Sequence, residues 1–224
     1  IYLSGWVENT TIEDVSVTGT TNFAITCHWT SDVLSGLPSK TWHSHNIVVR
    51  NCRVHQESGF NKPLRGFTFS AAGKVLIENC YSDTTTLGFN LFGGDYGYTY
   101  AQNITNNEAY NFTVRDCVHL GGGSALSADC VSVGLNGSPV WEGRNYNAYL
   151  LVDNFEIDGN DSVDGLLIGL TGLDKTIFKN INLYSDNATH TREFFYTQLC
   201  NNVYVSGDFK HHRFMRLRTT TYAT

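Results

Sequence analysis

Three acidic residues stand directly before short apolar segments, where a carboxylate could act as an acid or a base. Asp129 precedes "CVSV", Asp164 precedes "GLLI" and Glu193 precedes "FFYT". Two carboxyl groups about 5–5.5 Å apart suit a retaining glycosidase, and a separation of about 6.5–9.5 Å suits an inverting one. Crowding raises the pKa of one of the two groups, which then serves as the general acid. These three residues are the catalytic candidates.

Three longer segments combine aromatic residues with polar and charged ones. They are "HWTSDVLSGLPSKTWHSHN", "GGDYGYTYAQNITNNEAYN" and "NGSPVWEGRNYN". The flat apolar faces of pyranose rings pack on aromatic side chains, while carboxylates, amides and guanidinium groups bind hydroxyls. The alternative is that the aromatics only pack these segments onto the scaffold. The glycan-binding candidates are Trp29, Trp42, Arg65, Asn90, Asp95, Tyr96, Tyr98, Tyr100, Trp141, Glu142, Arg144 and Tyr146.

Composition excludes several classes of protein. The 224 residues carry a net charge of −6, with 16% charged residues and 21 Gly, which is typical of a globular chain. Basic residues gather only near the end, from Lys210 to Arg218, so no nucleic-acid partner is expected. No apolar run is long enough to span a membrane. The chain starts at Ile1 in mid-pattern, and we interpret residues 1–224 as a single domain within a longer protein.

A short pattern returns along the chain and identifies the elements that position these residues. "VRNC", "IENC" and "VRDC" share an aliphatic residue, a charged residue, Asn or Asp, and Cys. Looser copies extend the pattern through the chain at uneven intervals, which indicates a repeat architecture with variable connections. The repeated position is occupied by Asp14, Asn51, Asn79, Asp116, Asn154, Asn180 and Gly207.

Side-chain alternation around that position predicts two strands joined by a sharp bend. Apolar residues fall at −4 and −2, such as Ile47 and Val49, and again at +1 and +3, such as Cys52 and Val54. Period two on both sides indicates strands, and the change of parity at one residue indicates a bend. Asn, Asp and Gly accept the left-handed conformation that such a bend requires. Stacked side chains at the bend could form a hydrogen-bonded ladder.

A third strand is expected in every repeat. The segments are "FAITC", "RGFTF", "LGFNL", "DCVSV", "DGLLI", "EFFYT" and "RFMRL". Three of the repeats then carry a longer connection on one edge, and these are the aromatic segments. Parity places one outward column through Arg65, Leu87, Asp129 and Asp164, followed by Arg192 or Glu193. It places a second outward column through Thr68, Asn90 and Ser132.

Three strands per repeat with a one-residue bend resembles the right-handed parallel β-helix of the pectate-lyase-like superfamily. The resemblance covers nearly the whole chain and implies an all-β solenoid of about seven coils. A β-propeller is the alternative, but it needs four strands per repeat, and the shorter repeats here leave too little chain. In a β-helix, Cys52, Cys80 and Cys117 form an inward stack of free thiols rather than a metal site.

A closer resemblance is partial. "ADCVSVGLNG" is similar to the "DDC-V-A-I" segment of polygalacturonases, and "VDGLLIGLTG" resembles their "GHG" segment one coil later. That family implies acid and base roles for aspartates, and only Asp129 carries over. Leu87 and Ala128 stand where that family has Asp, and Asp164 stands where it has His. Lyase chemistry is a second enzymatic option, with Arg65, Arg144, Lys40, His43 or His45 as its basic groups. No metal or other cofactor is expected.

Among proteins with this fold, bacteriophage tailspikes and capsule depolymerases fit best. The resemblance implies a virion-surface or extracellular protein, possible homotrimerisation, and a bacterial capsule or O-antigen polysaccharide as partner. We therefore expect a protein that binds and cleaves a polysaccharide, with hydrolysis favoured over lyase chemistry. The alternatives are a non-catalytic receptor-binding domain and a structural solenoid or adhesin.

Overall fold

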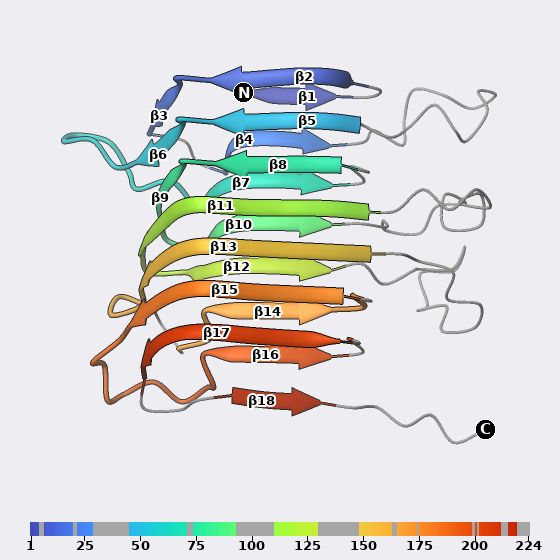
Figure 1. The fold of residues 1–224 in the computed structure, drawn as a ribbon. Coiled ribbons are helices and arrows are strands. Elements are labelled where there is room, and N and C mark those ends of the chain that lie inside the picture. Colours follow the sequence, from blue (N-terminus) through green and yellow to red (C-terminus); the bar gives the residue numbers. More distant parts are fainter. Residues whose placement is uncertain are drawn as a thin grey trace, which may run out of the picture.

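The computed structural model is all-β in the part of the chain that it describes. That part comprises residues 1–4, 7–19, 22–28, 45–70, 74–92, 110–129, 148–162, 165–173, 175–198, 200, 202–211 and 215–218. Its strands form two sheets in which every pairing is parallel, stacked in the ladder of Figure 1. The parallel all-β architecture predicted from the sequence is confirmed.

Sheet A contains the shorter strands. In sheet order they are β1 (Tyr2–Ser4), β4 (Phe23–His28), β7 (Arg65–Ser70), β10 (Leu87–Phe92), β12 (Ser124–Asp129), β14 (Ile168–Thr171), β16 (Phe195–Gln198) and β18 (Met215–Arg218). Each strand pairs with the strand of the preceding and following repeat.

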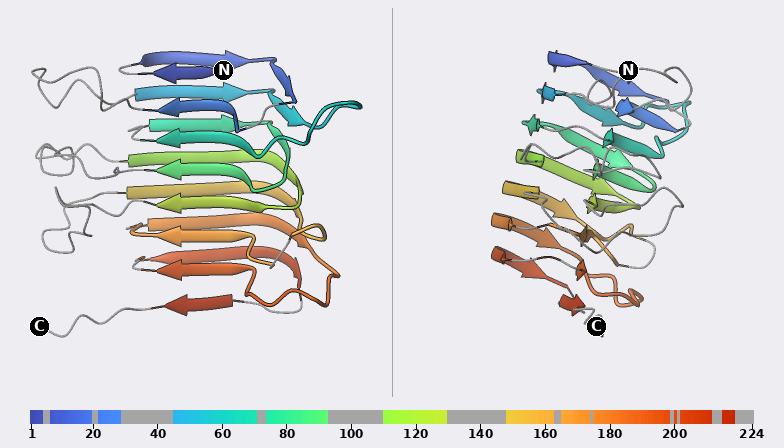
Figure 2. Two further views of the ribbon diagram at one scale, coloured as in Figure 1. Left: turned by 180° about the vertical axis from the view of Figure 1, so that it is seen from behind. Right: turned by 90° about the vertical axis from the view of Figure 1, so that its right-hand side faces the viewer.

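Sheet B contains the longer strands. They are β2 (Glu8–Glu13), β5 (His45–Arg50), β8 (Lys74–Glu78), β11 (Tyr110–Gly121), β13 (Ala148–Asp158), β15 (Lys175–Tyr184) and β17 (Val203–Lys210). Beyond the bend lie the short strands β3 (Ser16–Thr18), β6 (Arg53–His55) and β9 (Tyr81–Thr84), and the later strands run through the bend unbroken. One strand of sheet B, its continuation and the next strand of sheet A make what we call a rung. The described residues form seven rungs, with β2 at one end and β17 at the other (Figures 1 and 2).

The bend lies where the sequence predicts it. Backbone φ is positive at Asp14, Asn51, Asn79, Asp116, Asn154 and Asn180, between 49° and 57°, and Gly207 has φ 152°. The Asn51 amide donates to Asp14 at 3.1 Å, Asn79 to Asn51 at 2.8 Å, and Asn154 to Asp116 at 2.7 Å. The ladder is interrupted between Asn79 and Asp116, because a carboxylate has no proton to donate. Asn180 also leaves the ladder and donates to Asp153 at 2.9 Å.

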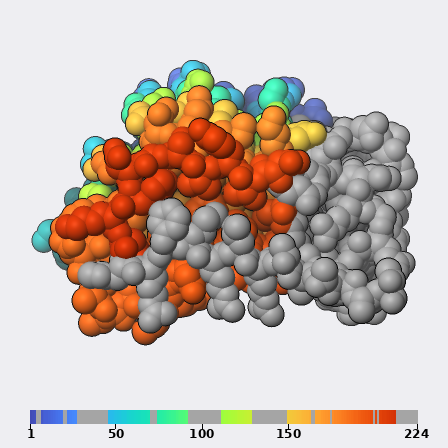
Figure 3. Space-filling view, turned by 60° about the horizontal axis from the view of Figure 1, so that its bottom comes forward, coloured from blue at the N-terminus to red at the C-terminus, as the bar shows by residue number. Residues whose placement is uncertain are grey.

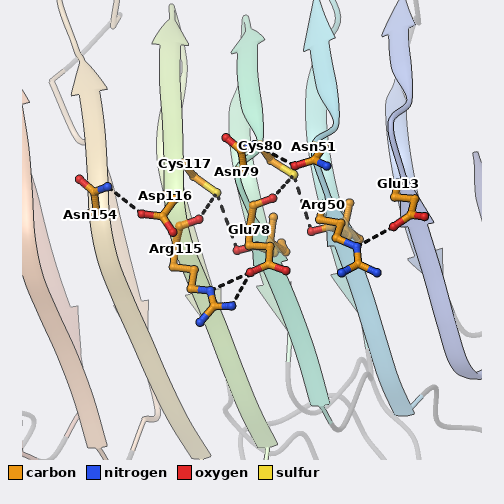
Figure 4. A network of polar contacts seen from close by, with 12 residues as sticks. Glu13, Arg50, Asn51, Glu78, Asn79, Cys80, Arg115, Asp116, Cys117 and Asn154 are labelled. Carbon is orange, nitrogen blue, oxygen red and sulfur yellow. Dashed lines mark hydrogen bonds and ion pairs between the residues drawn. The ribbon is translucent and has the colours of Figure 1, made fainter.

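The core lies between the two sheets and is rich in phenylalanine. Phe67 and Phe89 of sheet A stack with centroids 5.0 Å apart, and Phe155 of sheet B meets Phe89 edge-on at 5.3 Å. Just past the bend, Cys52, Cys80 and Cys117 are buried and free, as expected. Each thiol donates to the carbonyl two residues before it, at 3.1–3.2 Å. Figure 4 shows Cys80 and Cys117. Burial raises the pKa of the Cys52 thiol, so these cysteines are unreactive packing groups.

Replacing Asn79 with Val is expected to lower the free energy of unfolding by about 1–3 kcal/mol. A β-branched residue resists the left-handed conformation, and the ladder loses a donor. Urea unfolding measures the change. Asn61→Val is the matched control, because Asn61 is exposed and is not among the positive-φ residues. Equal unfolding midpoints for the two variants would contradict this role of Asn79.

Candidate functional site

The three long connections leave the same edge of sheet A. Residues 29–44 join β4 to β5, residues 93–109 join β10 to β11, and residues 130–147 join β12 to β13. The corresponding connections in other rungs are only residues 71–73, 172–174 and 199–202. Because all strands of sheet A are parallel, these connections start from one edge of the sheet. The expected clustering of long connections in three rungs is confirmed.

Most of the glycan-binding candidates lie in these connections, outside the described residues. This group comprises Trp29, Trp42, Asp95, Tyr96, Tyr98, Tyr100, Trp141, Glu142, Arg144 and Tyr146. Their binding role stays a prediction. Only Arg65 and Asn90 of the set fall on described strands.

A polar column crosses sheet A next to this edge. Strand register aligns Thr26 with Thr68, Thr68 with Asn90, and Asn90 with Ser127. In each strand these residues alternate with core residues such as Phe67 and Phe69, so they lie on the outer face. This part of the predicted outward column is correct, except that Ser127 stands in place of Ser132.

Three members of that column are buried although they lie on the outer face. Thr26, Thr68 and Asn90 are each 2% exposed. The Oγ1 atoms of both threonines and Oδ1 of Asn90 have no hydrogen-bond partner. Burying a polar atom without a hydrogen-bond partner costs about 1–3 kcal/mol. A row of three such atoms is therefore uncommon, and the polar groups next to it are of interest as partners. Asn90 is therefore less accessible than expected for a glycan contact.

Further polar groups adjoin the column. The Arg65 guanidinium lies over the Phe23 ring, 5.1 Å from its centroid, and is half-buried. In a later rung the half-buried Tyr196 donates its hydroxyl to Gln198 at 2.9 Å. Gln198 pairs in register with Thr171. An aromatic ring, an amide and a hydroxyl on one face form a surface suited to a hydroxylated ligand.

The predicted carboxylate column is wrong at Asp129. The fourth strand of sheet A is "SALSAD", residues Ser124–Asp129, rather than "DCVSV". Its inward positions are occupied by Ala125, Leu126 and Ala128, which are at most 1% exposed. Consequently Ser124 stands beside Leu87, and Asp129 is aligned with Phe92 on one side and Thr171 on the other.

The corrected register separates two of the catalytic candidates. Thr171, the neighbour of Asp129, is aligned with Gln198, which follows Glu193 by five residues. At about 3.3 Å per residue and 4.8 Å per strand, the Cα atoms of Asp129 and Glu193 lie about 19 Å apart. That distance exceeds the range of either glycosidase mechanism. Asp164 lies outside the described residues, so its pairing with Asp129 or with Glu193 stays a prediction.

Parity left the choice between Arg192 and Glu193 open, and the register of β16 favours Glu193. Backbone hydrogen bonds join Leu167 and Ile168 to the Phe194 carbonyl, and Ile168 is aligned with Phe195. Continuing this register upstream places Glu193 beside Leu166, in the column of Arg65, Leu87 and Ser124. The side chain of Glu193 is half-buried.

A polar cluster in the core was not anticipated from the sequence. Ser82 of β9 and His119 of β11 are aligned in an inward column, and Thr84 lies two residues beyond Ser82. All three are 0% exposed, and neither His119 nitrogen has a hydrogen-bond partner. Burial lowers the pKa of His119 to about 4, although the nearby Gly123 carbonyl opposes this. The available signal was the place of His119 three residues after the bend residue Asp116, where other repeats have an inward residue.

Among the described residues, no group of three or more His, Cys, Asp or Glu side chains is arranged to hold a metal ion. That part of the chain also contains no helix long and apolar enough to cross a membrane. Comparison with protein-family models, with curated proteins and with solved structures finds no match in any of the three.

Proposed function

We propose that the chain is a right-handed parallel β-helix of the pectate-lyase-like kind that binds a polysaccharide. One observation carries the proposal: three long connections rich in aromatic residues leave one edge of sheet A, beside a polar column on its outer face. Rigid parallel strands hold the connections, which suits a binding site built from variable segments on a fixed scaffold.

The chemistry of that edge fits a sugar chain better than an apolar ligand. Indole and phenol rings from the connections supply flat faces for pyranose rings. Half-buried side chains on the outer face of sheet A, including Arg65, Ser127 and Gln198, supply hydrogen-bonding groups. Rungs about 4.8 Å apart repeat these groups along the stack, so an extended polymer meets similar groups on successive rungs.

Cleavage of the bound polysaccharide is the second part of the proposal. Asp129 is the favoured acid or base, with Asp164 as its partner, and hydrolysis is favoured over elimination. The same binding edge without a working acid pair would make a receptor-binding domain. A purely structural solenoid would use its aromatic residues only for packing. A bacteriophage tailspike directed at a bacterial capsule or O-antigen, extracellular or on the virion, is the setting that the sequence resemblance favours.

Incubation with a panel of capsular and O-antigen polysaccharides separates these possibilities. New reducing ends without the ultraviolet absorbance of an unsaturated uronate indicate hydrolysis, and both signals together indicate a lyase. Binding without either signal indicates a receptor-binding domain. Absence of binding to a broad panel would favour the structural alternative.

Trp141→Ala and Tyr98→Ala are each expected to weaken affinity for the polysaccharide found in that panel by about 1–2 kcal/mol, the scale of one aromatic contact. Isothermal titration measures the loss, and circular dichroism checks that folding is unchanged. Tyr184→Ala is the matched control, because Tyr184 is an exposed tyrosine in β15 of sheet B, away from the long connections. Normal binding by both test variants would move the glycan site away from this edge.

A further inference from the structure

The outer face of sheet B carries an apolar column in a place where a strand facing solvent is usually polar. Register aligns Val48, Leu76, Thr113, Leu151 and Ile177, one residue from each successive strand. Each side chain is half-buried and alternates with a core residue. Tyr204 continues the column in β17 and is 58% exposed. The column is thus mostly apolar, with the exposed Thr11 of β2 and the half-buried Thr113 of β11 as its two threonines.

A column of charges runs beside the apolar column, two residues nearer the bend. Its members alternate in sign from rung to rung: Glu13, Arg50, Glu78, Arg115, Asp153 and Lys179. Arg50 meets Glu13 at 2.6 Å, Arg115 meets Glu78 at 2.5 Å, and Lys179 meets Asp153 at 2.8 Å. Figure 4 shows the first four of these side chains on one side of the sheet.

We propose that this face binds a second copy of the chain in an antiparallel pair, related by a two-fold axis parallel to the strands. Such an axis reverses the order of the rungs in the second copy. Each column of one copy then lies opposite the same column of the other. The apolar columns then pack on each other, about 10 Å separating the two sheets. An isologous interface of this kind requires a self-complementary surface.

The alternating charges are self-complementary in that arrangement. With the axis between the third and fourth rungs, Glu13 faces Lys179, Arg50 faces Asp153, and Glu78 faces Arg115 of the other copy. Every charge therefore meets an opposite one. A slip of one rung brings like charges together at every position, so the charge column also determines the register.

The other face-to-face arrangement is poorer. A two-fold axis along the stack, through the apolar column, would place the charged column against the outward residues on its other side. Those include Asn46, Lys74 and Lys175. Lys179 would then face Lys175 of the second copy, and only Glu78 would meet an opposite charge, on Lys74. The antiparallel pair is favoured because it alone uses all the charges.

The size of the face indicates a weak, reversible dimer. The six paired strands, about 4.8 Å apart, span about 24 Å, and five residues of each strand span about 16 Å. The resulting area per copy, about 400 Å², is below the roughly 800 Å² of a standard interface. Electrostatic complementarity then has a large influence on specificity, and added salt weakens the pair. The second copy lies against sheet B and not against the outer face of sheet A, so glycan binding and pairing are independent.

Sedimentation velocity of the chain over a range of concentrations and salt tests the proposal. The expected result is a monomer–dimer equilibrium that shifts toward monomer as salt is added. Arg50→Glu places Glu opposite Asp153 twice in each dimer and should weaken association at least about 10-fold. Exposed ion pairs contribute little to folding, so the variant should remain folded.

Combining Arg50→Glu with Asp153→Arg provides the decisive test. The double variant restores opposite charges between the copies but places like charges side by side within each chain: the new glutamate at position 50 beside Glu13 and Glu78, and the new arginine at position 153 beside Arg115 and Lys179. Recovery of dimerisation to within about 3-fold of the original is expected, because pairing between copies and not within the chain decides association. Failure to recover, with normal folding by circular dichroism, overturns the antiparallel arrangement.

Arg53→Glu is the matched control, because Arg53 lies past the bend and outside the charge column. It should dimerise like the original chain. Equal weakening by Arg53→Glu and Arg50→Glu overturns the proposal, since it would show a general effect of net charge. A monomer at every concentration, or a trimer, overturns it as well.

Discussion

Lowering the pH from neutral to about 4 is expected to destabilise the fold by about 3 kcal/mol through His119 alone. The side chain is fully buried, its nitrogens have no partners, and burial lowers its pKa from 6.5 to about 4. One pKa unit corresponds to about 1.4 kcal/mol, which gives the size of the effect. It equals the upper end of the range expected for Asn79→Val.

The direction of the effect follows from where the proton binds. The unfolded chain takes up a proton near pH 6.5, whereas the folded chain keeps His119 neutral until about pH 4. The contribution of neutral His119 to the free energy of unfolding is therefore fully present above about pH 6.5, and it is lost as the pH falls from there to about 4. Below about pH 4 both states carry the proton and the loss levels off. Lys62, a nearby positive charge, acts in the same direction as burial.

His119→Leu should remove this part of the pH dependence. Leu suits the column, because the neighbouring inward residue on β13 is Ile157. The difference in unfolding free energy between the original chain and the variant, measured by urea denaturation at several pH values, isolates His119 from the acidic residues. Ser82→Ala is the control: it changes the same column without a titrating group. An unchanged pH slope in His119→Leu would show that another group causes it.

The bends were predictable because one local rule determines them. Asn, Asp and Gly tolerate positive φ, and the switch in apolar parity marks the residue that needs it. Parity at Asn51 or Asn154 therefore locates the bend with no knowledge of the rest of the chain. A second row of positive-φ residues, Asn9 and Asn46, was missed. Its members are the second residues of β2 and β5, where no change of apolar parity marks them.

The strands of sheet A were harder to locate, because their inward residues are not always large. The fourth strand buries Ala125 and Ala128 next to Leu126. The strand was instead predicted at the downstream segment "VSV", whose residues have a higher β-propensity. Apolar periodicity is recognised mainly from large side chains, whereas a narrow part of the core is filled by small ones. The resulting error of five residues moved Asp129 into the column of Arg65. An error in strand register therefore misplaces every candidate residue that was assigned from that register.

Burial of polar residues was also beyond prediction from the sequence. Thr68 and Asn90 have the parity of outward residues and lie on the outer face, yet their side chains are 2% exposed. Parity reports which face of a strand a residue occupies, not what covers that face. His119 presents the reverse case, since its inward parity was readable but its lack of partners depends on side chains from other strands.

In a chain that cleaves its polysaccharide, Asp129→Asn is expected to reduce turnover at least about 100-fold, the usual contribution of a positioned acid or base. Affinity should change only a few-fold, since the amide keeps the size of the carboxyl group. Steady-state kinetics on the polysaccharide identified in the panel measure both quantities. Asp208→Asn is the matched control, because Asp208 is exposed on β17, away from sheet A.

Combining variants distinguishes a catalytic pair from separate groups. If Asp129 and Asp164 act together, the double variant should be little worse than either single one, because paired groups act as a unit. Glu193→Gln should behave differently: at about 19 Å from Asp129, its effect on turnover should simply multiply with that of Asp129→Asn. Non-multiplicative effects of Asp129 and Glu193 would contradict the register of sheet A. Full turnover in Asp129→Asn would remove Asp129 from the mechanism, and binding without turnover in the original chain would leave the receptor-binding function.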